Sequence, residues 1–230
     1  MADNDFKRPT VILFDVNETL LDLNPLRESI DSVLLESEGA QLWFNTMLQY
    51  SLVMTLNNQF APLPEIGAAT LKMLARNREV TLTDEQAKEA LAPMRTLEPH
   101  PDVRPALERL RAEGFRLATL TNSSASGAKA QLEHAGLADC FDKQMSVETI
   151  AKYKPHPEVY LWAASEMQAE AGECMLVAAH GWDIAGAGWA GLSTGFIARW
   201  GNQEFPLAKP ADLAASDLGG LAEKLKALSK

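Results

Sequence analysis

The 230-residue chain is poor in cysteine and in basic residues. Its two cysteines, Cys140 and Cys174, do not form a C-x-x-C pair, so we expect buried free thiols in a reducing cytoplasm. Lysine and arginine number 21 against 31 aspartates and glutamates, which gives a formal net charge of -10. Because binding to phosphate backbones needs a basic face, this balance argues against nucleic acid as a main partner. It still allows a small anionic substrate, since a few local cations can override the overall charge.

The sequence also lacks a long apolar run. No stretch approaches the roughly 20 apolar residues that a membrane-spanning helix needs, so we expect no membrane partner. The N-terminal segment MADNDFKRPT is polar and has no apolar core of a signal peptide, which favours a cytoplasmic location. Hydrophobic residues nevertheless make up 47% of the chain, which is enough for a full core and predicts a folded protein.

Strand-like and helical patterns alternate over most of the chain. Strand-like apolar runs occupy residues 10–15, 116–122, 174–180 and 193–199, with a weaker run at 141–146. Helical periodicity fills residues 102–114, 124–136 and 157–172, and each of these segments ends on glycine. This alternation predicts a parallel sheet with right-handed crossovers.

Residues from about 25 to 98 break the alternation, because they look helical and contain no clear strand. Prolines cluster on the far side of this segment, between Pro93 and Pro105. The sequence therefore predicts an α/β fold with a Rossmann-like parallel sheet core and helices on both of its faces. Residues 1–24 and 99–230 would form that core, and residues 25–98 a helical cap inserted after the first strand.

Polar residues follow the predicted strands at the edge where open parallel sheets bind ligands. In chain order these residues are Asp15, Thr19, Thr121, Asn122, Lys154, His180 and Asp183. One edge of the sheet is thus expected to carry two carboxylates, an amide, hydroxyls and a single lysine. Together they indicate a catalytic site, although no single residue does so alone.

Each residue also has an ordinary structural interpretation. Asp15 could end a turn, and Thr121 and Asn122 could cap the helix at 124–136, a role compatible with ligand binding. A lysine in a loop, such as Lys154, is usually solvated. The flanking residues and the two acids favour a buried ion pair instead.

The fourth strand end leaves two interpretations open. Asp183 could cap the helix that follows it, and His180 suits a core edge and a functional position equally well. Several aromatic residues are most simply explained as core or cap packing, namely Trp43, Phe44, Trp182 and Trp189.

Four short motifs resemble those of the haloacid dehalogenase superfamily. In order, they are FDVNETL (14–20), LTNSS (120–124), YKPHPEVY (153–160) and VAAHGWD (177–183). The helical insertion after the first motif resembles the cap of that superfamily. Phosphatases of the superfamily carry an acidic proton donor two residues after the nucleophile, where this chain has Asn17. An amide cannot donate a proton at neutral pH, whereas a halide leaving group needs none.

The fine pattern resembles the (S)-2-haloacid dehalogenase branch, which implies a hydrolase acting on carbon–halide bonds. In that branch an aspartate attacks C2 of a short haloacid and displaces halide, and water then cleaves the ester. The resemblance implies Asp15 as the nucleophile, with Thr19 and Lys154 orienting it and balancing its charge. It implies no metal and no cofactor, and a small carboxylic acid as the partner. It leaves a homodimer open.

The resemblance also assigns residues around the substrate. Those expected to contact it are Thr121, Asn122, Asn17, Phe44, Tyr160, His180 and Trp182. Thr121 matches a hydroxyl that binds the substrate carboxylate, and Asn122 matches an amide on the halide side. Asp183 matches the acid that prepares the water, with His180 as the second choice.

Some positions depart from the branch pattern. Phe44 stands where the branch usually has an arginine that receives halide, and Asn17 replaces a tyrosine. Ala178 and His180 replace a serine and an asparagine of the fourth motif. Three alternatives therefore remain. They are a magnesium phosphatase with variant motifs, a hydrolase of another activated C–X bond in a small carboxylic acid, and a non-catalytic binding protein.

Overall fold

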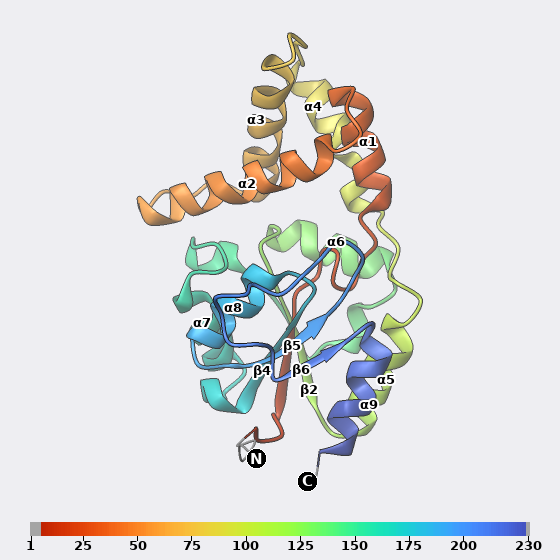
Figure 1. The fold of residues 1–230 in the computed structure, drawn as a ribbon, viewed down its shortest axis with the longest axis vertical. Helices are drawn as coiled ribbons and strands as arrows, with labels where there is room; N and C mark the ends of the chain where they lie inside the picture. The colour runs from red at the N-terminus through yellow and green to blue at the C-terminus, as the bar shows by residue number, and fades with distance from the viewer. Residues whose placement is uncertain (1–5, 229–230) are drawn as a thin grey trace.

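The computed structural model describes residues 6–228 of the chain, which contain one parallel sheet (Figure 1). Its strands are β1 (Val11–Phe14), β2 (Arg116–Thr121), β3 (Lys143–Ser146), β4 (Cys174–Ala178), β5 (Ser193–Ile197) and β6 (Leu213–Ala215). The strand order is β3-β2-β1-β4-β5-β6, and all neighbouring strands are parallel. The predicted α/β class is therefore confirmed. Strand β6 was not predicted.

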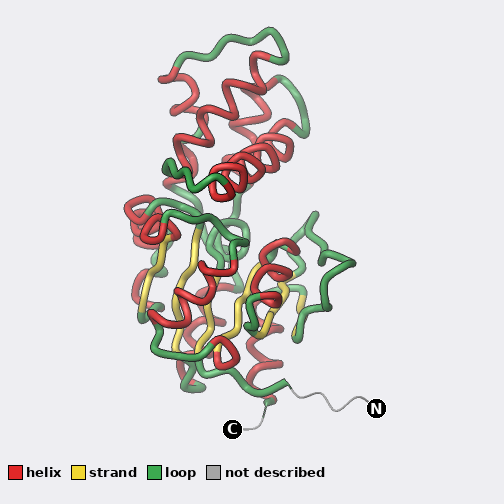
Figure 2. The backbone as a smooth tube through the Cα atoms, turned by 90° about the vertical axis from the view of Figure 1, so that its left-hand side faces the viewer, coloured by secondary structure: helices red, strands yellow, loops and turns green. Residues whose placement is uncertain are grey.

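Helices cover both faces of the sheet, as Figure 2 shows. They are α5 (Val103–Ala112), α6 (Ala125–His134), α7 (Pro157–Glu166), α8 (Gly181–Trp189) and α9 (Leu218–Ala227). Helices α5 and α9 pack on each other, and α7 and α8 pack on each other on the other side of the sheet (Figure 1). This double cover explains why β1 and β4 are buried over their whole length and are built from apolar residues.

The helix expected over residues 157–172 is shorter than predicted. Helix α7 ends at Glu166, and Gln168 has a left-handed backbone with φ of 51°. A short 3₁₀ turn (Ala171–Glu173) then leads into β4. The helical pattern of the sequence continues through this turn, because a 3₁₀ turn places apolar residues at spacings close to those of an α-helix.

Residues 24–95, called here the cap segment, form helices above the carboxyl end of the sheet (Figure 1). They are α1 (Asn24–Leu34), α2 (Gly39–Leu56), α3 (Leu63–Arg76), α4 (Asp84–Ala90) and the 3₁₀ turn η1 (Ala92–Arg95). Helix α2 packs against both α1 and α3. The segment is thus helical, as the sequence predicted.

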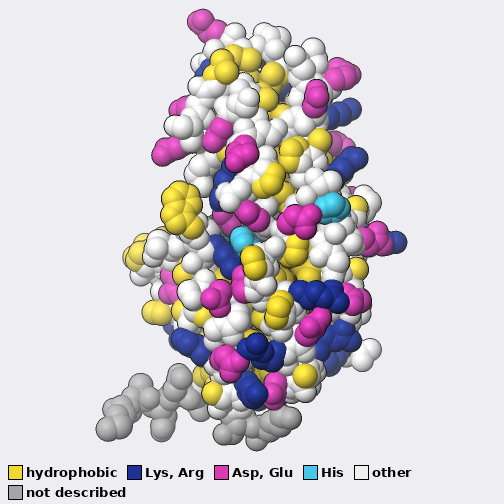
Figure 3. Space-filling model, turned by 90° about the vertical axis from the view of Figure 1, so that its right-hand side faces the viewer, with side chains coloured by type: hydrophobic (Ala, Val, Ile, Leu, Met, Phe, Trp, Pro, Cys, Tyr) yellow, Lys and Arg dark blue, Asp and Glu magenta, His cyan; other side chains and the backbone are white. Residues whose placement is uncertain are grey.

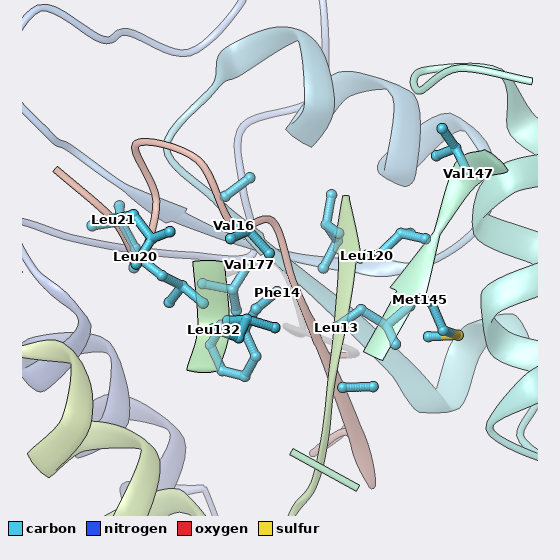
Figure 4. Close-up of a cluster of buried hydrophobic side chains, with 14 of the residues drawn as sticks. Leu13, Phe14, Val16, Leu20, Leu21, Leu120, Leu132, Met145, Val147 and Val177 are labelled. Atoms are coloured by element: carbon cyan, nitrogen blue, oxygen red, sulfur yellow. The ribbon is translucent and has the colours of Figure 1, made fainter. Parts of the chain in front are cut away.

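An apolar cluster fixes the end of β1, where Asp15 begins the site. Leu13 and Phe14 of β1 lie with Leu120 of β2 and Val177 of β4 (Figure 4), and all four are fully buried. Burial of such side chains contributes about 1.5–3 kcal/mol each. Asp15 therefore follows a rigid strand.

The surface carries side chains of both charges. Acidic and basic side chains are interspersed over the face that Figure 3 shows. Within residues 6–228, no helix combines the length and the apolar character needed to cross a bilayer.

Candidate active site

The candidate site residues meet at the carboxyl edge of the sheet. Asp15 follows β1, and Thr121 is the last residue of β2. Lys154 lies in the segment between β3 and α7, and His180 lies at the start of α8, just after β4. Because these strands are parallel and adjacent, positions far apart in the sequence come together as predicted.

Lys154 lies at the centre of the site and is fully buried. Its Nζ donates to Asp15 Oδ1 at 2.9 Å and to Asp183 Oδ2 at 2.6 Å. A buried ammonium is costly unless it is paired and hydrogen-bonded, and here two carboxylates pair with it. The predicted ion pair is therefore present, and Lys154 is not a solvated loop residue.

The charges shift the pKa values of this cluster. Burial alone would raise the pKa of Asp15, but Lys154 and His180 outweigh burial and hold that pKa well below its usual range. Burial would lower the pKa of Lys154, but the two carboxylates raise it. Burial, together with the charge of Asp15, raises the pKa of Asp183 despite its contact with Lys154. Asp15 is thus kept as an anion, which a nucleophile requires.

Asp183 uses both carboxylate oxygens in contacts with neighbouring side chains. Its Oδ2 accepts from Lys154, and its Oδ1 accepts from the Tyr160 hydroxyl at 2.5 Å. A glycine makes this contact possible, because a Cβ on Gly186 would lie 2.4 Å from Pro155 Cβ and 2.8 Å from the Tyr160 oxygen. Tyr160 is fully buried, and its hydroxyl supports the Asp183 carboxylate. The contact with substrate that the resemblance implies for Tyr160 stays a prediction.

Thr19 fixes the second oxygen of Asp15. Its hydroxyl donates to Asp15 Oδ2 at 2.7 Å and accepts from the backbone N–H of Ala179 at 2.9 Å. Because the N–H of Ala179 donates to this oxygen, the hydroxyl proton is directed toward Asp15. Thr19 thus orients the Asp15 carboxylate.

His180 lies beside Asp15 and stacks with two aromatic rings. Its Nδ1 lies 3.3 Å from Asp15 Oδ2, and its Nε2 lies 2.9 Å from Glu18 Oε2. Phe44 stacks on the imidazole with centroids 5.4 Å apart, and Trp182 stacks on it at 5.3 Å. Phe44 and Trp182 therefore have a specific task in this structure beyond filling space.

Glu18 was not predicted from the sequence as a site residue. This residue lies inside the first motif and is 8% exposed, and its φ of 66° falls in the left-handed region. That backbone conformation brings its carboxylate to His180, and its other oxygen accepts from Arg27 of α1. An acid in a motif beside the nucleophile was a usable signal, but its backbone conformation was not visible in the sequence.

Asn17 forms hydrogen bonds with the loop before helix α6 and with α6 itself. Its amide donates to Ser123 Oγ at 2.9 Å, and its oxygen accepts from Gln131 Nε2 at 3.1 Å. Gln131 also donates to the backbone oxygen of Met94 in the cap segment at 2.8 Å. Neither Ser123 nor Gln131 was predicted from the sequence as a partner of Asn17.

Thr121 and Asn122 shape the loop after β2. The Thr121 hydroxyl oxygen accepts from Ser123 N–H at 3.1 Å, and Asn122 Oδ1 accepts from Lys154 N–H at 2.9 Å. The Asn122 amide N–H lies 3.5 Å from the Lys154 carbonyl, which is long for a hydrogen bond. This N–H can therefore turn toward a ligand.

A cavity of about 40 Å³ lies over these groups. Its wall contains the predicted residues Asp15, Asn17, Phe44, Thr121, Asn122, His180 and Trp182. Apolar side chains of the cap segment complete it, among them Leu26, Met47 and Met94. Four predicted site residues are absent from this wall, namely Lys154, Thr19, Tyr160 and Asp183. Thr19 and Lys154 contact Asp15, which lines the cavity, and Tyr160 and Asp183 lie behind Lys154. The arrangement presents one ionised carboxylate to a small, largely apolar space.

The donor set for a metal is limited. Across residues 6–228, no cluster of three or more histidine, cysteine, aspartate or glutamate side chains is arranged to hold a metal ion. The ammonium of Lys154 instead lies between the carboxylates of Asp15 and Asp183.

Comparison with known proteins identifies the family. Residues 9–191 match the model of the haloacid dehalogenase-like hydrolases. The chain belongs to this family. The superfamily predicted from the four motifs is therefore confirmed, and the protein is a hydrolase by family.

Two curated relatives match over nearly the whole chain. The (S)-2-haloacid dehalogenase of Pseudomonas sp. (strain YL) is 27% identical over 214 residues, covering 92% of this chain and 92% of its own. The (S)-2-haloacid dehalogenase 1 of Pseudomonas sp. (strain CBS-3) is 29% identical over 221 residues, covering 95% and 97%. The predicted branch is thus the one that these relatives represent.

The fold is also found among solved structures. The L-2-haloacid dehalogenase of Xanthobacter autotrophicus superposes with a TM-score of 0.87 at 22% identity, covering 96% of this chain and 100% of that one. At this identity the match supports the fold.

Proposed function

We propose that the protein is a metal-independent hydrolase that displaces halide from a short 2-haloacid through an ester of Asp15. The observation that carries the proposal is the state of Asp15 in its cavity. Lys154 and Thr19 hold this carboxylate as an oriented anion, and Asn17 two residues later cannot act as a proton donor. Such a site suits displacement of a group that leaves without a proton.

The first step is a nucleophilic substitution. An oxygen of Asp15 forms a bond to C2 of the acid while the C2–halogen bond breaks, and halide leaves with the bonding electrons. The cavity is small and lined mainly by apolar side chains, which favours reaction of the carboxylate without a full hydration shell. Alignment with C2 can contribute several kcal/mol.

The second step is hydrolysis of the ester. Water attacks Cγ of Asp15, the bond from Cγ to the ester oxygen breaks, and the 2-hydroxy acid leaves. We propose that backbone N–H groups after Asp15 stabilise the oxyanion. The Asp15 carboxylate thereby gains one oxygen from water in each cycle.

The residue roles follow from the same geometry. Thr121 and Asn122 line the cavity and are proposed as contacts for the substrate carboxylate and the halide, respectively. We also propose a core of residues 1–24 and 99–230 with a cap of residues 25–98. A cytoplasmic location and a homodimer are proposed along with this function.

The test is turnover in heavy-oxygen water, followed by mass spectrometry of the peptide that contains Asp15. With 2-bromopropionate, the label should enter Asp15, and Asp15→Asn should release no halide. The matched control Asp84→Asn changes an exposed carboxylate of the cap segment and should keep full turnover. Label in the product without label in Asp15 would exclude the ester.

The phosphatase alternative predicts a different result. Activity toward 2-haloacids should survive EDTA, because Lys154 supplies the positive charge at Asp15. Hydrolysis of a phosphate ester that is lost with EDTA and restored by magnesium would replace the dehalogenase proposal.

A further inference from the structure

Hydrolysis of an ester needs a base that reaches water, and Asp183 is poorly placed for this task. Its side chain is fully buried, and both oxygens already accept short hydrogen bonds from Lys154 and Tyr160. It is also absent from the cavity wall. To accept a proton from water, Asp183 would have to give up the contacts that keep Lys154 buried as a cation.

His180 meets the requirement that Asp183 does not meet. Its ring lines the cavity, and Nδ1 faces Asp15 Oδ2 at 3.3 Å. Phe44 and Trp182 both stack on the ring, which favours one orientation of the imidazole. Its remaining nitrogen, Nε2, is held by Glu18 at 2.9 Å.

Glu18 is itself held in place on several sides. Its Oε1 accepts from Arg27, and its backbone oxygen lies 3.0 Å from His100 Nε2. Its left-handed backbone is unusual for a residue other than glycine, and such conformations persist where the surrounding structure fixes them. The loop after β1 therefore adopts an unfavourable conformation that points this carboxylate at His180.

We propose that His180 is the base that activates water for ester hydrolysis and that Glu18 is its positioning residue. This inference rests on the proposed function, because it concerns the second half of that reaction. Glu18 accepts the Nε2–H of the imidazole, which places the lone pair of the neutral ring on Nδ1, toward Asp15. This is the arrangement by which a carboxylate orients a catalytic histidine in other hydrolases.

The proton balance closes over one cycle. Alkylation removes the charge of Asp15 while halide leaves with the bonding electrons. Water then attacks Cγ of Asp15 while Nδ1 of the imidazole takes one water proton. When the ester bond breaks, the second water proton goes to the oxygen of the departing alcohol, and Asp15 is again a carboxylate. The proton on Nδ1 then leaves to solvent as the acid equivalent of the halide.

The position of His180 depends on the cap segment. Phe44 lies on α2 and Arg27 on α1, whereas Asp15, Glu18 and His180 belong to the loops after β1 and β4. The base is therefore held on one face, and through Glu18, by residues of the cap segment. Ester hydrolysis requires these contacts, whereas alkylation requires Asp15, Lys154 and Thr19.

The experiment separates the two half-reactions by rapid quench with 2-bromopropionate. We expect Glu18→Gln to release a first equivalent of bromide at nearly the wild-type rate, and His180→Gln to lose much less of this first phase than of its steady turnover. Steady turnover should then fall, by about 10²-fold or more for His180→Gln and about tenfold for Glu18→Gln. Intact-mass spectrometry should show the Asp15 ester accumulating in both variants, which a purely structural defect would not produce.

Glu36→Gln is the matched control, because it removes a carboxylate paired with Arg78 within the cap segment and should leave both phases unchanged. The inference is overturned if Asp183→Asn accumulates the ester while His180→Gln does not. It is also overturned if Glu18→Gln slows the bromide burst without ester accumulation. Melting curves show whether Glu18→Gln and His180→Gln are folded. If only one of these two variants folds, its burst and its ester accumulation still test the inference. If the wild type releases no halide from any 2-haloacid, the proposed function fails instead.

Discussion

At the scale of single residues, the site depends on how Asp15 is held. Burial favours the neutral carboxylic acid, but the ammonium of Lys154 and the imidazole of His180 favour the anion and lower the pKa of Asp15. Because the native pKa lies below the unfolded one, ionised Asp15 stabilises the fold above about pH 4. This contribution is lost as the pH falls toward the lower native pKa.

This depression predicts the pH dependence of alkylation. An ordinary aspartate would be about half protonated near pH 4, whereas Asp15 should remain ionised there. The rate of the bromide burst should therefore change less than about twofold between about pH 7 and about pH 4. Stopped-flow detection of bromide over this range measures it. A loss centred near pH 4 would show that Asp15 is an ordinary carboxylate.

The halide side of the cavity gives a second prediction. Phe44 offers no hydrogen-bond donor, so departing halide depends on the loosely bound amide of Asn122 or on the indole N–H of Trp182. Fluoride needs the strongest donors, so we expect bromoacetate and chloroacetate to react faster than fluoroacetate. Asn122→Ala should lower the chloride rate by about tenfold, the value of one hydrogen bond to a charged group. Fluoroacetate as the best substrate, or an unchanged rate in Asn122→Ala, would contradict this assignment.

At the scale of helices and strands, the sequence predicted most elements but not their exact ends. Apolar runs identified β1, β2, β4 and β5 because these strands are buried on both faces. Strand β6 escaped because it has three residues and is only partly buried, so it carries no apolar run. The end of α7 at Glu166 was missed, since the turn after it continues the helical spacing.

The site was predictable to the extent that it depends on strand ends. Asp15, Thr19, Lys154 and Asp183 were found because parallel strands bring their carboxyl ends to one edge. Glu18 was missed, since its contact with His180 requires a left-handed backbone. The contact between Gln131 and Asn17 was missed as well, because it depends on how α6 packs and not on any local pattern.

One ion pair joins several elements and sets a stability prediction. Asp102 before α5 accepts two bonds from the Arg199 guanidinium, both at 2.9 Å, and one from Leu218 N–H of α9 at 2.8 Å. Arg199 also donates to the backbone oxygen of Thr19 at 3.1 Å. Asp102→Ala should therefore lower the free energy of unfolding by about 2–3 kcal/mol.

The chain contains a matched control for this ion pair. Asp139 also accepts two bonds from one guanidinium, that of Arg104, but its side chain is 70% exposed. Asp139→Ala should lower the free energy of unfolding much less than Asp102→Ala, because solvent screens exposed pairs. Urea unfolding of both variants measures the difference, and equal losses would contradict the structural role given to Asp102.

At the scale of the whole molecule, a larger cleft lies next to the small reaction cavity. It has a volume of about 630 Å³ and lies between the cap segment and helix α6. Its walls are mainly apolar on the cap side, with Trp43 and Leu91, and carry serines on the α6 side. Met47, Leu63 and Met94 line both the cleft and the reaction cavity, so the two spaces adjoin.

This junction predicts that the enzyme also accepts 2-haloacids with longer chains. A chain that extends from C2 past Met47 and Met94 would enter the apolar cleft, and each buried methylene contributes about 0.8 kcal/mol. Ala130 is exposed on α6 and lines the cleft, whereas Ala125 is exposed on the same helix and does not. Ala130→Trp should therefore lower kcat/KM for 2-bromooctanoate by about tenfold or more while leaving 2-bromopropionate unchanged, since it removes room only for the chain. Ala125→Trp should change neither value. If Ala130→Trp slows both acids equally, the cleft is part of the route to Asp15 for every substrate. If the wild type rejects 2-bromooctanoate, the cleft does not hold the acid chain.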